Sequence, residues 1–157
     1  EWIESNPEVY CNPKFHPELP SWSQNNFRWK VEISNNELKQ NLNKIKSIGT
    51  LKDIVVLERG NSGRIIKAKF IGSEDSLLLN SELEIRKIKD PPFRSSCFVF
   101  EKYFDSDGEE FYQFNGAGWG HGVGMCQSGA VARAYKGQTF YQILNHYFPE
   151  TEIKRVY

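Results

Sequence analysis

Apolar and polar residues alternate along some stretches of the chain and recur at helical spacing along others. Trp29, Val31 and Ile33 alternate with charged residues, which is typical of a strand with one buried face. The patterns predict strands over 28–33, 53–58, 64–71, 77–79, 96–104 and 109–115, a helix over 35–45, and short helices over 81–88, 127–135 and 140–147. We therefore expect an α+β fold of mostly antiparallel strands and hairpins with three short helices.

Local signals mark where several of these elements begin and end. Three pairs have the spacing of a helix capping box, Ser34–Glu37, Ser81–Glu84 and Thr139–Gln142. Gly137 is placed to end the helix before it in a left-handed conformation. Glycine-containing connections at 59–63 and 105–108 predict two hairpins.

The first part of the chain lacks such periodicity. Residues 1–28 are rich in proline and aromatic side chains, so we expect a loop-rich segment that continues from a missing upstream half. A poorly ordered arm is the alternative. The first residue is Glu1 and no signal peptide is visible, so we expect a processed form or a fragment. Residues 29–157 are expected to form the C-terminal part of a larger domain, on grounds given below.

Composition narrows the class of protein. Hydrophobic residues make up 39% of the 157 positions, which indicates a globular chain. Twenty basic residues balance twenty acidic ones, so charge gives no basis for binding nucleic acid or an anionic membrane. No apolar run is long enough to span a bilayer. The three cysteines, Cys11, Cys97 and Cys126, are too few and too scattered to predict a disulfide framework.

Six of the twelve glycines lie between Gly116 and Gly129, a segment that we call the glycine loop. Within it, four glycines alternate with three larger residues, in the order Gly118, Trp119, Gly120, His121, Gly122, Val123 and Gly124. Glycine inside an element costs ~0.5–1 kcal/mol relative to alanine. A run of this kind indicates a backbone with positive φ angles, or one that another molecule approaches closely. The pattern places the loop at a strand-to-helix junction.

Three familiar glycine-rich sites do not fit this loop. A phosphate-binding P-loop needs a lysine at its end, and none occurs between Lys102 and Lys136. The dinucleotide pattern G-x-G-x-x-G is absent in every register, and no parallel βαβ unit follows. A transmembrane G-x-x-x-G face would need a long apolar helix.

The side chains of the loop suggest an oxygen-rich ligand instead. Free amide groups could bind polar or anionic atoms, Trp119 has a flat face of the kind that stacks on sugar rings, and His121 and Gln127 supply hydrogen bonds. The alternative is a structural crossover in which Trp119 is part of the core and His121 merely has its hydrogen bonds satisfied.

Other candidate groups carry weaker signals. His16 follows Cys11 at a spacing that would suit half a zinc site, but no second pair of ligands is evident. His146 lies near the end of an amphipathic helix and is expected to be partly buried or solvated. Cys126, at a helix start, is a candidate nucleophile with His121, which makes an unrelated cysteine hydrolase a further alternative.

Residues 115–130, with the sequence NGAGWGHGVGMCQSGA, resemble the signature of the SpoIID/LytB family of stage II sporulation protein D and amidase-enhancer proteins. Residues 141–149, YQILNHYFP, are similar to that family's closing helix, and 63–72 and 29–34 fit its earlier segments more loosely. The resemblance covers roughly residues 29–157 and implies a peptidoglycan lytic transglycosylase, which cleaves denuded glycan strands to 1,6-anhydro products without water. It also implies an extracytoplasmic place in the bacterial cell envelope and a cell-wall amidase as a partner.

The resemblance lacks one catalytic element. The family's presumed acid is a glutamate in an alanine-rich helix, whereas the only alanine-rich stretch here, 130–134, contains Arg133 but no glutamate. We therefore expect the acid, and any zinc site of the family, in the upstream half, with no metal or other cofactor in this chain. His121 and Gln127 are expected to support catalysis. Substrate-binding positions are expected at Gly118, Trp119, Gly120, Gly122, Gly124 and Arg133. A non-catalytic glycan-binding or amidase-enhancing module is the alternative.

Overall fold

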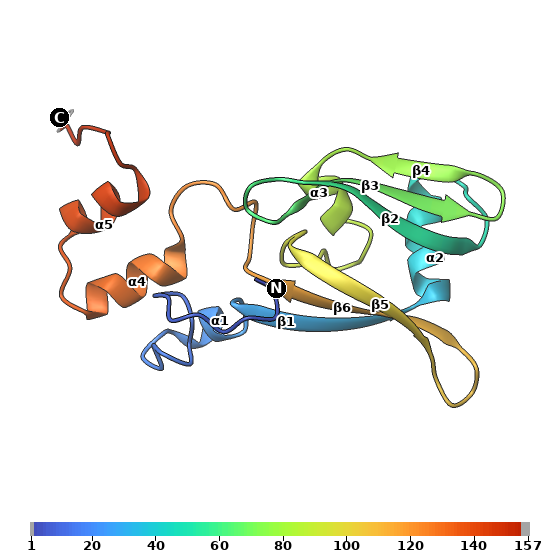
Figure 1. Cartoon of the computed structure of the whole chain (residues 1–157), viewed down its shortest axis with the longest axis horizontal. Coiled ribbons are helices and arrows are strands. Elements are labelled where there is room, and N and C mark those ends of the chain that lie inside the picture. The colour runs from blue at the N-terminus through green and yellow to red at the C-terminus, as the bar shows by residue number, and fades with distance from the viewer. Residues whose placement is uncertain (1, 155–157) are drawn as a thin grey trace. The chain divides into compact units, whose positions relative to one another are not determined.

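The computed structural model describes residues 2–154, which form two compact units. The first comprises residues 28–121 and contains both sheets, and the second combines the residues up to 27 with those from 122 onward (Figure 1). The α+β class with antiparallel sheets is confirmed. Among the described residues there are five helices, which are the four predicted from the sequence and α1 (Ser21–Gln24), which was not predicted.

One sheet of the first unit has the strand order β1-β6-β5. β1 (Arg28–Ser34) and β5 (Phe98–Phe104) both pair antiparallel with β6 (Glu110–Ala117), which is therefore the central strand. The β5–β6 turn is closed by the carboxylate of Asp105, which accepts hydrogen bonds from the amides of Asp107 and Glu109. From the end of β6 the chain continues directly into the glycine loop.

The other sheet has the order β2-β3-β4. β2 (Leu51–Arg59) and β3 (Ile65–Gly72) form the expected hairpin, and β4 (Ser76–Leu79) pairs antiparallel with β3. The guanidinium of Arg59 closes the β2–β3 turn by donating to the carbonyl of Gly63, and it also reaches Phe98 of the first sheet. The two sheets are thus joined by hydrogen bonds as well as by packing.

A single hydrophobic core lies between these sheets. It takes side chains from all six strands and from two helices of the unit, α2 (Asn35–Ile45) and α3 (Glu82–Arg86). An aromatic cluster of Trp29, Phe93, Phe98 and Phe114 occupies the part nearest the end of β6, with ring centroids 4.8–6.2 Å apart. Burial of such large rings stabilises the scaffold beneath the glycine loop.

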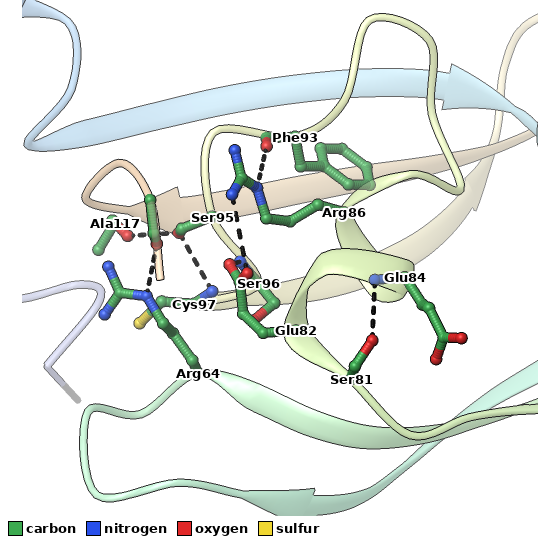
Figure 2. Close-up of polar contacts among 11 residues, drawn as sticks. Arg64, Ser81, Glu82, Glu84, Arg86, Phe93, Ser95, Ser96, Cys97 and Ala117 are labelled. Atoms are coloured by element: carbon green, nitrogen blue, oxygen red, sulfur yellow. Dashed lines mark hydrogen bonds and ion pairs between the residues drawn. The ribbon is translucent and has the colours of Figure 1, made fainter. Parts of the chain in front are cut away.

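The predicted helix starts are largely confirmed. Ser34 and Ser81 cap α2 and α3 by accepting from the amides of Glu37 and Glu84, and Figure 2 shows the second of these contacts. The complete reciprocal capping box forms at Thr139 with Gln142, at the start of α5 (Phe140–Tyr147). α3 ends at Arg86, earlier than expected, and the carbonyl of Arg86 accepts from the amide of Phe93 instead.

The second unit contains α1 (Ser21–Gln24), α4 (Gln127–Tyr135) and α5. α4 ends as predicted at Gly137, whose φ is +80°. The amides of Gly137 and Gln138 bond back to the carbonyls of Ala134 and Arg133, which is the Schellman arrangement. No helix among residues 2–154 is long and apolar enough to cross a membrane.

Candidate functional site

The glycine loop leaves β6 at Ala117 and enters α4 at Gln127, which confirms the predicted strand-to-helix junction. Its four alternating glycines, Gly118, Gly120, Gly122 and Gly124, have φ angles of +74° to +81°. Residues with side chains rarely adopt such angles, so glycine is required at each of these positions. The glycines alternate with larger residues because the backbone has a positive φ at every second position of this segment.

The first and last glycines of the loop serve a different purpose. At Gly116, within β6, a side chain would collide with the indole ring of Trp29. At Gly129, within α4, a side chain would collide with the hydroxyl of Tyr147. These two positions allow close packing, whereas the four between them allow a special backbone path.

Side chains from distant parts of the first unit hold the start of the loop. The carbonyl of Ala117 accepts from Ser95 Oγ at 2.7 Å, and that of Gly118 accepts from Trp29 Nε1 at 3.0 Å. The carbonyl of Gly120 accepts from Arg64 Nε at 2.8 Å. The backbone from 117 to 120 is therefore fixed on one side by three separate donors.

Residues 93–97 form the scaffold for these contacts (Figure 2). Buried Ser95 accepts from the amide of Cys97 while its hydroxyl donates to Ala117. Glu82 accepts from the amide of Ser96 and pairs with Arg86 at 3.7 Å. A further backbone bond runs from the amide of Gly120 to the carbonyl of Arg94, at 2.8 Å. This polar network pins the loop to the end of the sheet.

The side chains that the loop carries are exposed. Trp119 retains 60% of its surface accessible to solvent and Val123 retains 77%, and His121 is also exposed. The alternative in which Trp119 belongs to the core is therefore wrong. An exposed indole on a fixed backbone is an available surface for a flat ligand.

The predicted site residues divide between the two units. Gly118, Trp119, Gly120 and His121 belong to the unit formed by residues 28–121. Residues from Gly122 onward belong to the other unit, and these include Gly124, Gln127 and Arg133. Gln127 is exposed at the first position of α4. The structure thus brings together the first group with Trp29, Ser95 and Arg64, none of which was predicted.

Arg133 has several partners within its own unit. Its guanidinium lies 4.1 Å from the ring centre of Tyr10 and donates to Gln138 Oε1 at 3.0 Å. Its second amino group lies 2.8 Å from His146 Nε2, which must accept because arginine only donates. These contacts explain how Arg133 is positioned, and its expected role toward substrate stays a prediction.

The cysteines and His16 have local partners. The thiol of Cys126 caps α4 by accepting from the amide of Gly129 at 3.4 Å. Burial raises the pKa of the Cys97 thiol, although Arg64, Arg59 and Arg28 oppose that shift. His16 stacks on Tyr10 and lies 3.1 Å from Glu18. Among residues 2–154, no three His, Cys, Asp or Glu side chains gather in a group that could hold a metal ion.

The acidic residues of the β5–β6 hairpin lie away from the loop. Glu110 pairs with Lys102 at 3.0 Å and contacts Asn35, and it begins β6, whereas the loop follows the end of that strand. Seven residue steps at ~3.4 Å each separate the two ends. Glu101 accepts a hydrogen bond from Gln113 across the same hairpin.

Two comparisons with known proteins bear on this site. The model of a family described as "Domain of unknown function (DUF8618)" matches residues 17–124. A Bacillus subtilis (strain 168) protein named amidase enhancer is 48% identical over 42 residues, which are 27% of this chain and 6% of that protein. The chain therefore spans only a small fraction of that relative's length.

Proposed function

We propose that this chain, which belongs to the DUF8618 family, binds the glycan strands of peptidoglycan as part of a lytic transglycosylase resembling the SpoIID/LytB proteins. The relative named amidase enhancer supports a role connected with the cell wall. The observation that carries the proposal is the construction of the loop. Its backbone from 117 to 120 is held by three side-chain donors, while Trp119 and His121 face solvent.

Each candidate residue has a defined task in this proposal. Trp119 stacks on a pyranose ring, and the neighbouring glycines let the sugar lie against main chain. His121 donates to or accepts from a sugar hydroxyl or N-acetyl group, or orients the catalytic carboxylate. In the other unit, Gln127 pairs with an acetamido group through its own amide, and Gly122 and Gly124 are the proposed substrate-binding glycines.

The chemical step needs one carboxylic acid. This group protonates the leaving glycosidic oxygen and then removes the proton from the C6 hydroxyl, which attacks C1 and closes the 1,6-anhydro ring. Burial beside apolar groups would bring its pKa near the working pH. We assign this acid to sequence outside the present chain. We also propose that the protein acts on the extracytoplasmic side of the envelope, together with an amidase that removes the peptides.

Binding to denuded glycan strands tests the proposal. The chain is expected to bind amidase-treated strands in isothermal titration calorimetry, and Trp119→Ala is expected to weaken binding at least tenfold. Trp22→Ala is the matched control, because Trp22 is also half-exposed, at 51%, but lies on α1. Absence of binding, or equal loss in both variants, would refute a glycan site at the loop.

A second candidate function is a non-catalytic module that binds glycan and stimulates an amidase, which the name of the relative favours. Mass spectrometry of the products separates the two. If the protein is a transglycosylase, 1,6-anhydro ends should form only when it contains the upstream acid. His121→Ala in this longer protein should then abolish them. If it is an amidase enhancer, no 1,6-anhydro ends should form with or without the upstream sequence, and the amidase should release peptides faster in its presence.

A further inference from the structure

Arg64 is held at one edge of its guanidinium group and open at the other. Its Nε donates to the carbonyl of Gly120 at 2.8 Å, which fixes the orientation of the planar group. Within the described part of the chain, its two amino groups have no hydrogen bond and no ion pair. Figure 2 shows these amino groups on the side of the guanidinium away from Ser95.

The loop keeps the open edge uncovered. A side chain at Gly118 would begin only 3.2 Å from one amino group of Arg64, so glycine at this position leaves that group accessible. Trp119 lies between the two residues that Arg64 approaches, Gly118 and Gly120. The guanidinium is therefore next to the backbone on both sides of Trp119, whose indole is exposed.

Two further arginines, Arg28 and Arg59, act on the same thiol, Cys97, that Arg64 influences. Arg59 uses its amino groups on the carbonyls of Gly63 and Phe98, so it is committed to the scaffold. Among residues 2–154, no carboxylate pairs with Arg64. A half-buried arginine without a counter-ion, oriented by one bond, is suited to bind an anion through two parallel N–H groups.

We propose that Arg64 binds the lactyl carboxylate of N-acetylmuramic acid in the glycan strand. This inference rests on the proposed function and adds the feature of the strand that is recognised. N-acetylmuramic acid differs from N-acetylglucosamine by a lactyl ether, whose carboxylate is free once the peptide has been removed. A site with Arg64 beside Trp119 would therefore favour peptide-stripped strands over both intact peptidoglycan and chitin-like polymers.

The experiment compares two tetrasaccharides that differ in this group. One alternates N-acetylglucosamine with N-acetylmuramic acid, and the other is chitotetraose, which has no carboxylate. The full chain is expected to bind the acidic tetrasaccharide at least tenfold more tightly in calorimetry. Arg64→Gln should bring the ratio of the two affinities close to one, since loss of the bond to Gly120 alone would lower both affinities alike and leave their ratio unchanged.

Two further variants separate charge from loop anchoring. Arg64→Lys keeps the charge but cannot reproduce the planar fork, so it should recover part of the ratio. Lys69→Gln removes one positive charge from an exposed position on the adjoining strand β3 and should leave the ratio unchanged.

The possible outcomes are distinct. If Arg64→Gln weakens binding of both tetrasaccharides equally, Arg64 only anchors the loop and the inference is overturned. If the wild-type chain binds both equally, the inference also fails, although the proposed glycan site stands. If neither tetrasaccharide binds, the proposed function itself fails and the inference with it.

Discussion

The indole nitrogen of Trp29 donates a hydrogen bond to the carbonyl oxygen of Gly118, 3.0 Å away and 89 positions later in the chain. The same indole fills the space beside Gly116, its partner across the β1–β6 pair. One buried side chain thus packs against the end of β6 and also fixes Gly118, the first of the four glycines with positive φ. The position of the proposed binding surface depends on the interior of the sheet.

Gly116→Ala should be strongly destabilising, because the new methyl group would overlap the rings of Trp29. Overpacking of this kind costs about 1–3 kcal/mol in the free energy of unfolding, measured here by urea denaturation. Gly60→Ala is the control, since Gly60 has no positive φ and an added methyl group there would meet its nearest atom at 3.7 Å, an ordinary contact. An equal loss in the two variants would contradict a packing role for Gly116.

Trp29→Phe should loosen the start of the loop. The phenyl ring removes the donor to Gly118, at a net cost of about 0.5–1.5 kcal/mol for the hydrogen bond, and it also leaves space unfilled beside Gly116. Hydrogen exchange of the Gly120 amide, which bonds to the carbonyl of Arg94, should become faster than in the wild-type chain. Unchanged protection of that amide would show that Ser95 and Arg64 suffice to hold the loop.

Gly129→Ala should be coupled to Tyr147, whose hydroxyl occupies the space of the new methyl group. Alanine inside a helix is favoured over glycine by about 1 kcal/mol, so the clash opposes an intrinsic gain. In a Tyr147→Phe background the same substitution should be neutral or stabilising. A double-mutant cycle by thermal or urea denaturation measures the coupling, expected at about 0.5–3 kcal/mol. Additive effects would mean that Tyr147 moves aside freely.

Local signals in the sequence were sufficient for most of the strands, the hairpins and the helix caps. They work because a capping box or a hairpin turn is specified by residues only a few positions apart, as at Thr139 with Gln142. The four-residue helix α1 was missed because it has no such signal. Its N-cap is Pro20, and no side chain caps it.

The loop itself was predictable, but its supports were not. The alternation of glycines from Gly118 to Gly124 already indicated positive φ angles, which the structure confirms. Arg64, Ser95 and Trp29 reach the loop from 56, 22 and 89 positions away, and nothing in their local sequence distinguishes them from other core or surface residues. Long-range contacts of this kind depend on strand order, which periodicity does not specify.

Tyr112→Phe should stabilise the chain, increasingly so at alkaline pH. The hydroxyl of Tyr112 is buried in the core with no hydrogen-bond partner among the described residues, so its removal is expected to be neutral or favourable at pH 7.

Burial raises the pKa of Tyr112 from 10.0 to about 12, so the unfolded chain loses this proton first as the pH rises. The free energy of unfolding is therefore unaffected by this group below pH 10, and it falls between pH 10 and about 12 as Tyr112 deprotonates in the unfolded chain. The phenylalanine variant lacks this loss, which gives it an added advantage of about 1 kcal/mol at pH 11. Urea denaturation at pH 7 and pH 11 measures the difference, with Tyr103→Phe, a partly exposed tyrosine of β5, as the control. A constant difference between wild type and Tyr112→Phe at the two pH values would show that the phenol ionises equally in the folded and unfolded chain.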